Sequence, residues 1–240
     1  MIPLPLAFVL GLTAPVLPAL ANEAVVKKTV EPRLKEIFGE GVKIDAVRKT
    51  GVLGLYEISS GGDVIYSDNR GQYLFIGDLL DTKAKKNLTE ERKNALAQIK
   101  FSELPFDLAI KQVKGKGQRV LASFEDPNCG YCKRLAKELQ SIDNITLYTF
   151  LYPILSPDST EKAKAIWCSA DRVKAWNGYM IDNVVPAATK CDASAVDKTV
   201  ALGRQLNIRG TPTIFLVDGS RLPGFVPAAR LEALLDAAGR

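Results

Sequence analysis

The 240-residue sequence contains no histidine and only four cysteines. A zinc site usually takes about four ligands, from two CxxC pairs or from one CxxC pair with histidines. The chain offers one such pair, Cys129 and Cys132, and its other cysteines, Cys168 and Cys191, do not form a second. Covalent haem attachment requires histidine directly after the second cysteine, where this chain has Lys133. Haem is therefore excluded, a metal site is disfavoured, and we predict no cofactor.

The chain also lacks a concentrated charge. Its formal net charge is +5, and basic residues are scattered or followed by acidic ones, as Lys85-Lys86 are by Glu90-Glu91. This pattern indicates a solvated surface and no nucleic-acid partner. With 47% hydrophobic and 25% charged residues, the composition is that of a globular protein, and the length suits one large or two ordinary domains.

Residues 1–21 contain no charged side chain and end in Ala19-Leu20-Ala21. This is typical of a secretory signal with an A-x-A cleavage site, although the usual basic start is missing. Four prolines interrupt the stretch, which argues against a membrane anchor, and no later segment is long and apolar enough to span a bilayer. We expect a secreted protein without stable membrane insertion, in an oxidising compartment that permits disulfides.

The most informative feature is Cys129-Gly130-Tyr131-Cys132, which follows a strand-like run over 120–124. If a helix begins near Cys129, its unpaired backbone N–H groups and the positive end of its dipole favour the thiolate. In such places the cysteine pKa falls from about 8.5 to between roughly 3.5 and 7.5. We predict thiol–disulfide exchange, with Cys129 as the nucleophile and Cys132 as the thiol that resolves a mixed disulfide. A purely structural short-loop disulfide is the alternative.

Four cysteines permit three pairings. Because Cys129 and Cys132 are closest in sequence, they form the natural first bridge, which leaves Cys168 with Cys191. That second bridge closes a loop of 24 residues, and chain entropy assigns it about 3.4 kcal/mol of stabilisation at most. We predict a structural disulfide. A second redox pair is the alternative, but nothing near Cys168 resembles the start of a CxxC helix.

The first predicted domain is a small α+β unit over 22–82. A helix is expected over 25–38, with Val26, Val30, Leu34 and Phe38 on one side. Turn residues then separate four expected strands, over 42–47, 52–58, 64–66 and 73–76. Because such a unit buries too little surface to be robust alone, we predict that it is a dimerisation domain. Packing against the second domain is the alternative.

A linker helix is expected within 83–103, because Thr89 followed by Glu90-Glu91 is typical of a helix N-terminus. The second domain, 104–240, begins with a basic stretch that leads into the strand before the CxxC pair. The segments that follow are predicted as helix to 139, strand 145–152, a mostly helical region 160–206, strands at 214–217 and near 222, and helix 227–238. This order describes an α/β fold, a thioredoxin-like catalytic domain with a helical insertion.

The whole chain after the signal resembles the DsbC/DsbG family of periplasmic thiol:disulfide isomerases, and DsbC within it. CxxC with a later Thr-Pro is shared by thioredoxin folds generally, whereas the Trp-Cys and Cys-Asp pairs and the N-terminal module are specific to this family. The segments that carry the resemblance are Cys129-Gly130-Tyr131-Cys132, Ala165-Ile166-Trp167-Cys168, Cys191-Asp192, Gly210-Thr211-Pro212 and Pro223-Gly224.

The resemblance implies a periplasmic protein disulfide isomerase with chaperone activity, active on misfolded secreted proteins with wrong disulfides. It implies a V-shaped homodimer joined through the N-terminal modules, and a membrane reductant resembling DsbD. Thr211, Pro212, Gly130 and Tyr131 would bind substrate, with Pro212 in the cis form. A reductase resembling DsbG and a dimeric chaperone without redox turnover remain alternatives, whereas the N-terminal module argues against an oxidase resembling DsbA.

The chain departs from the family at Lys133, where DsbC commonly has histidine. Without an imidazole beside the second cysteine, the reduction potential of the family does not transfer to this chain. A lysine ammonium at this position can still favour the thiolate electrostatically.

Overall fold

The computed structural model of the chain describes residues 23–187 and 190–239. The signal predicted over 1–21 lies outside the described residues. The chain divides into two compact units, with the boundary between Ile76 and Gly77. None of the helices within the described residues has both the length and the hydrophobicity needed to cross a bilayer.

The N-terminal unit packs one helix, α1 (Glu23–Phe38), on a four-stranded antiparallel sheet in the order β1-β2-β3-β4. The strands are β1 (Ala46–Lys49), β2 (Tyr56–Ser60), β3 (Asp63–Ser67) and β4 (Leu74–Phe75). Val26, Val30 and Leu34 are spaced by four residues and face the sheet, where they join Tyr56 and Ile58 in one core. The predicted helix is therefore confirmed, but Phe38 at its end is exposed.

The strand predicted over 52–58 is wrong in its first half. Residues 50–55 form a turn instead, in which the Thr50 hydroxyl accepts from the N–H of Val52 and Thr50 N–H donates to Leu55. Leu53 has a positive φ within this turn and is exposed.

A later turn holds Gly71 against α1 so closely that a Cβ at Gly71 would lie 2.6 Å from Val30. Glycine is therefore required there.

A short hairpin and a helix begin the C-terminal unit. The hairpin pairs β5 (Leu80–Asp81) with β6 (Lys86–Asn87), and α2 (Leu88–Leu96) follows directly. The N-cap predicted at Thr89 is wrong, because the Asn87 side chain accepts from Glu90 N–H at the start of α2. Thr89 is buried and its hydroxyl accepts from Leu79 N–H, which ties the helix to the hairpin.

A five-stranded mixed sheet forms the core of the C-terminal unit, in the order β11-β10-β8-β9-β7. Only β8 and β9 run parallel. The strands are β7 (Ala109–Lys114), β8 (Arg119–Glu125), β9 (Ile145–Leu151), β10 (Thr213–Leu216) and β11 (Arg221–Pro223). The edge strand β7 lies in the basic stretch for which we predicted no strand. Its last four residues alternate between exposed and half-buried, so it lacks the apolar run of a central strand.

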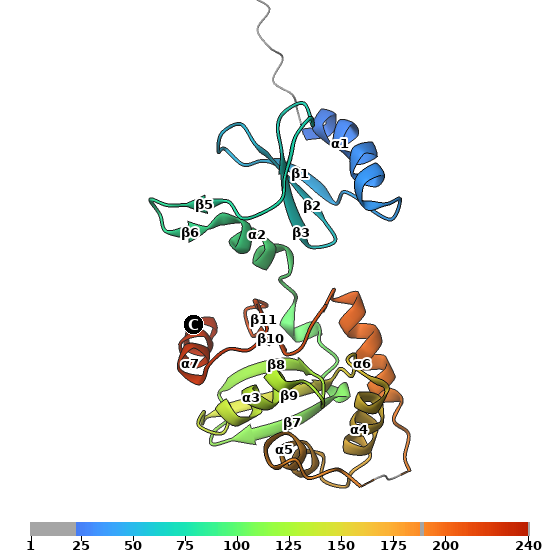
Figure 1. Cartoon of the computed structure of the whole chain (residues 1–240). Coiled ribbons are helices and arrows are strands. Elements are labelled where there is room, and N and C mark those ends of the chain that lie inside the picture. The colour runs from blue at the N-terminus through green and yellow to red at the C-terminus, as the bar shows by residue number, and fades with distance from the viewer. Residues whose placement is uncertain (1–22, 188–189, 240) are drawn as a thin grey trace, which may run out of the picture. The chain divides into compact units, whose positions relative to one another are not determined.

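Helices cover both faces of this sheet (Figure 1). On the face that carries Leu121 lie α3 (Gly130–Glu138) and α7 (Ala228–Ala238). The other face, with Phe124 at its centre, receives part of α6 (Ser194–Gln205). The predicted helical insertion consists of α4 (Pro157–Trp167), α5 (Arg172–Asp182) and α6, which gather in Figure 1 beside the sheet. The thioredoxin-like fold and the small α+β unit are therefore confirmed.

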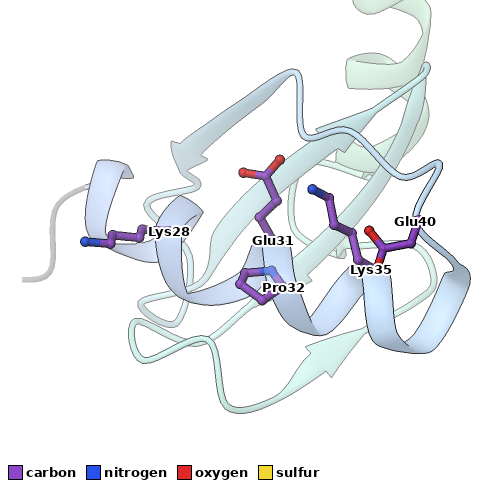
Figure 2. A pocket seen from close by; sticks show the side chains of 5 residues that line it. All are labelled: Lys28, Glu31, Pro32, Lys35 and Glu40. Atoms are coloured by element: carbon purple, nitrogen blue, oxygen red, sulfur yellow. The ribbon is translucent and has the colours of Figure 1, made fainter.

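A shallow pocket lies on α1 in the N-terminal unit (Figure 2). Glu31 and Lys35, four residues apart, rise from one face of the helix, whereas Lys28 points away from them. Because Lys28, Lys35, Glu31 and Glu40 bring charges of both signs to this pocket, it favours neither anions nor cations. Both free thiols belong to the other unit.

Candidate active site

The CxxC pair lies where the central strand β8 turns into helix α3. Cys129 is the N-cap of α3, as its place in the sequence predicted, and its N–H donates to the Asp126 carbonyl at 3.0 Å. Its sulfur accepts from Cys132 N–H at an S···N distance of 3.3 Å. The first orphan donors of the helix therefore point at this sulfur. Both cysteines are free and buried in the structure.

Asp126 fixes the loop before Cys129. This carboxylate is fully buried, and one oxygen accepts from Asn128 N–H at 2.8 Å. Its other oxygen accepts from the N–H groups of Ile154 and Leu155 at 2.7 and 2.9 Å. A single carboxylate thus joins the loop before Cys129 to the segment after β9. Hydrogen bonds of this kind to an ionised group are the stronger ones in proteins, so the loop is held in place.

Asn128, directly before Cys129, is held by four partners. Its amide nitrogen donates to the Ser156 hydroxyl and to Asp158 at 3.2 and 2.7 Å. Its amide oxygen accepts from Lys162 and from the Tyr179 hydroxyl at 3.0 and 2.9 Å. Helices α4 and α5, which make up most of the predicted insertion, therefore buttress the active-site loop directly.

The surroundings of Cys129 lower its thiol pKa from 9.0 to about 6. The largest cause is a hydrogen bond from the Cys132 thiol; the Thr211 side chain and the N–H groups of Cys132 and Tyr131 add to it, while partial burial opposes it. The Thr211 hydroxyl has no partner among the described groups and so is free to donate to the thiolate. At pH 7 a thiol with this pKa is about nine-tenths ionised.

Cys132 has the opposite electrostatic character. Burial raises the pKa of its thiol strongly, since the side chain has no exposed surface, and the neighbouring Cys129 and Glu125 raise it further. The side chain of Cys132 is thus less exposed than that of Cys129, and its thiol is the less acidic of the two, in the direction that the sequence predicts. The Cys129 sulfur is therefore the more easily ionised of the two, and the Cys132 sulfur holds its proton.

Thr211 and Pro212 lie beside Cys129 although they are more than eighty residues away in sequence. Their peptide bond is cis, as the resemblance implied. The thiol of Cys129 donates to the Thr211 carbonyl at 3.2 Å. The carbonyl of Pro212 accepts from Gly224 N–H at 2.8 Å. Thr211 therefore presents both its hydroxyl and its backbone to the sulfur.

Exposed apolar side chains border the CxxC loop. Gly130 is exposed, and nothing lies within 4 Å of the place where a Cβ would stand, so the CxxC loop is open to solvent at this residue. Asp126 holds one bordering segment, and Lys133 holds another through its hydrogen bond to Asn183. Tyr131 of the CxxC loop is also exposed. We call this side chain and the exposed apolar side chains of the two segments the apolar rim: Tyr131, Ile154, Leu155, Val184 and Val185.

Lys133 occupies the position at which the family commonly has histidine. Its ammonium donates to Asn183 Oδ1 at 2.7 Å and lies 4.6 Å from the centre of the Tyr179 ring. Both contacts hold the Lys133 ammonium beside α5. The thiolate of Cys129 depends first on the hydrogen bonds already described.

Cys168 and Cys191 are joined by a disulfide in the structure, with 5.5 Å between their Cα atoms. Cys168 is the C-cap of α4, and Cys191 lies in the segment before α6. This bond joins the end of α4 to the segment before α6 and so closes the loop that contains α5. The two free thiols of the chain are those of the CxxC pair, and Cys168 packs against the core cluster that contains them.

Sequence reasoning missed three groups that shape the site: Glu125, Asp126 and Asn128. Their position between a buried strand and the CxxC helix start was the available signal, because polar residues in such a run need partners when buried. Their partners come from segments up to about fifty residues away. Spacing in the sequence could not identify them.

Two family models cover nearly the whole chain. Residues 106–239 match a thioredoxin-like domain, and residues 18–90 match the N-terminal domain of disulfide bond isomerase proteins. A Bordetella pertussis protein named "Probable thiol:disulfide interchange protein DsbC" is 50% identical over 206 residues, which is 86% of this chain and 73% of the relative. Escherichia coli K12 DsbC is 28% identical over 222 residues, 91% of this chain and 89% of that one. The crystal structure of a disulfide interchange protein from Neisseria gonorrhoeae matches with 37% identity and a TM-score of 0.55, over 57% of this chain and 99% of that chain.

Proposed function

Because the chain belongs to the DsbC family of thiol:disulfide interchange proteins, we propose that it is a periplasmic disulfide isomerase that rearranges wrong disulfides in misfolded secreted proteins. The observation that carries the proposal is the asymmetry of the CxxC pair. Cys129 is acidic at the start of α3, whereas Cys132 is buried and holds its proton. A thiolate beside a slow resolving thiol is what isomerisation requires.

The reaction begins when the Cys129 thiolate attacks one sulfur of a client disulfide. The client S–S bond breaks, a mixed disulfide to Cys129 forms, and the other client sulfur leaves as a thiolate. A second client thiolate then attacks the client sulfur of the mixed disulfide. This forms the corrected client disulfide and releases Cys129 as a thiolate. If Cys132 attacks first, the client leaves reduced and the pair is oxidised. A membrane reductant resembling DsbD then has to return two electrons to the pair.

Thr211 and the apolar rim support client binding. An extended client segment beside Cys129 can pair with the backbone of Thr211, as strands do in β-augmentation. The rim adds exposed apolar surface on segments that hydrogen bonds hold next to the CxxC loop. Such surface suits unfolded chains, which expose their own apolar side chains. The same rim supports a chaperone activity that does not require a redox step.

The N-terminal unit supports a homodimer. Strand β4 is at the edge of the sheet, and Phe75 and Ile76 at its end are exposed. An exposed apolar edge strand is a template for pairing with a second chain. The variant Ile76→Lys is expected to convert a dimer into a monomer in size-exclusion chromatography with light scattering. Leu53→Lys, an exposed turn residue of the same unit, is the matched control and is expected to leave the dimer intact. A monomeric wild-type protein would contradict the proposed interface.

Three refolding assays separate the candidate activities. An isomerase restores activity to a scrambled multi-disulfide protein in mild reductant, whereas an oxidase introduces bonds into a reduced one. A reductase resembling DsbG instead reduces single oxidised cysteines, such as a sulfenic acid, back to the thiol. We expect the first assay to give the largest rate. In a fourth assay, suppression of aggregation, Cys129→Ser is expected to retain wild-type activity. Strong oxidation without rescue of the scrambled protein would overturn the proposal.

A further inference from the structure

Arg134 is an exposed cation on helix α3, one turn after Tyr131 of the CxxC loop. Its guanidinium carbon lies 4.5 Å from the centre of the Phe225 ring and 5.8 Å from the centre of the Tyr131 ring. Both distances fall within the range of cation–π attraction. Because Tyr131 and Arg134 are three residues apart, they share one face of the helix. The guanidinium is therefore held in place by two rings from separate segments.

Both rings belong to segments that are tied to Cys129. Tyr131 lies inside the CxxC loop, and its N–H is among the donors that favour the Cys129 thiolate. Phe225 follows Gly224, whose N–H donates to the carbonyl of the cis-proline at 2.8 Å. The residue before that proline is Thr211, whose carbonyl accepts from the Cys129 thiol at 3.2 Å. Arg134 thus borders the two loops between which a client segment has to lie when its sulfur meets Cys129.

The charge of Arg134 is not neutralised within the described residues. Its guanidinium forms no hydrogen bond or ion pair with any group of that part of the chain. The acidic residues of the neighbouring helices have other partners. Glu138 of α3 accepts from the first N–H of α7 at 2.8 Å. On α7, Glu232 and Asp236 pair with Arg119 at 3.4 and 3.5 Å. A guanidinium that is fixed by rings and keeps its N–H donors free is suited to bind an anionic group.

We propose that Arg134 binds a carboxylate of the client, so that Cys129 reacts faster with client cysteines that have aspartate or glutamate nearby in the client sequence. A guanidinium donates two parallel N–H bonds to one carboxylate, a geometry that an ammonium does not reproduce. The sulfur chemistry is unchanged, and Arg134 acts on the choice of client. This inference rests on the proposed function and deepens it, because it names a class of client.

A pair of cysteine peptides tests this preference. Each peptide carries its cysteine as a mixed disulfide with thiopyridine, an uncharged leaving group whose release is measured by absorbance, and has either glutamate or glutamine on both sides of the cysteine. Cys129 attacks the peptide sulfur, because the leaving thiol with the lower pKa departs faster. Division of each rate by the rate with mercaptoethanol removes the intrinsic reactivity of the peptide. The wild type is expected to favour the glutamate peptide by roughly fivefold, the upper end for an exposed charge pair.

Two variants show whether Arg134 causes the preference. In Arg134→Gln the ratio of the two normalised rates is expected to fall to about one, while alkylation of Cys129 by iodoacetamide keeps its midpoint near pH 6. Lys137→Gln removes the next exposed cation of α3 and is the matched control, which is expected to keep the wild-type ratio. In roughly 1 M salt, where the Debye length is about 3 Å, the wild-type ratio is expected to fall below about two.

A wild-type ratio of one, or a ratio that Arg134→Gln leaves unchanged, would overturn the inference. An equal loss in Lys137→Gln would also overturn it, because the preference would then come from the general charge of the helix. A wild-type protein that favours the glutamate peptide but does not rescue a scrambled client would contradict the proposed function instead, so the two failures are distinguishable.

Discussion

The two cysteine pairs of this protein differ in everything except residue type. Cys129 and Cys132 are free, three residues apart, and surrounded by donors from a helix start. Cys168 and Cys191 are bonded, 23 residues apart, and join the end of α4 to the segment before α6. The first pair has its two thiol pKa values displaced in opposite directions, whereas the second cannot titrate while bonded. Surroundings, not sulfur chemistry alone, therefore make the two pairs different, and the predictions below test whether one is reactive and the other structural.

Removal of the nucleophile gives the largest expected effect on this comparison. Cys129→Ser is expected to lower the rate of scrambled-substrate refolding by on the order of a thousandfold or more, because no other described thiol is both free and acidic. Cys132→Ser is the matched control, which is expected to retain the first attack and to accumulate mixed disulfide detectable by mass spectrometry. Residual turnover in Cys129→Ser would mean that the second pair carries redox chemistry.

Removal of the second pair is expected to change stability and not reactivity. In a Cys168→Ala, Cys191→Ala double variant, the free energy of unfolding should fall by about 3 kcal/mol, as expected for the loss of a closed loop of this length. Urea denaturation measures this loss. Alkylation of Cys129 in the folded variant should proceed at the wild-type rate. Unchanged stability together with slowed client turnover would contradict a structural role for the bond.

Loss of a single donor should move the thiol pKa by a smaller amount. Thr211→Val keeps the side-chain shape and removes the hydroxyl that favours the thiolate, so the pKa of Cys129 is expected to rise by roughly one unit. A hydrogen bond to a charged group contributes about 1.5–3 kcal/mol, and one pKa unit corresponds to about 1.4 kcal/mol. The pH dependence of alkylation measures the shift. An unchanged midpoint would exclude the hydroxyl as a donor.

Lys133→Gln should have the smallest effect of the four changes. Because the ammonium binds Asn183 and lies over Tyr179, its loss is expected to move the pKa of Cys129 by less than about 0.5 units, within the range of weak screened charge interactions. The same alkylation assay compares it directly with Thr211→Val. A rise as large as that of Thr211→Val would show that lysine takes over the electrostatic role of the family histidine.

The sequence was sufficient for the parts of the site that are local. A CxxC pair after an apolar run predicts a helix start at Cys129, and the structure has that helix beginning at Gly130 with Cys129 as its cap. The apolar runs of β8, β9 and β10 predicted their strands, because buried strands leave a strong hydrophobic signal. The edge strand β7 left none, since only part of it is buried.

The parts that depend on distant partners could not be predicted. Asp126 binds N–H groups that lie 28 and 29 residues later, and Asn128 binds Tyr179 on α5. Asn87 and Thr89 are equally suitable N-cap residues by type. Asn87 is the N-cap in the structure, whereas Thr89 is buried and bonded to Leu79 before the hairpin. The role of a polar residue is set by what folds against it, and short sequence windows do not contain that information.

The pH dependence of Cys129 alkylation tests the central claim most directly. In the reduced protein, iodoacetamide reacts with the thiolate, so the rate should rise about tenfold per pH unit at low pH and level off above a midpoint near 6. Peptide mass spectrometry assigns the modified site, and Cys132 should remain unmodified over this range. A midpoint above about 8, as in an ordinary free cysteine, would contradict a prepared nucleophile and with it the proposed isomerase.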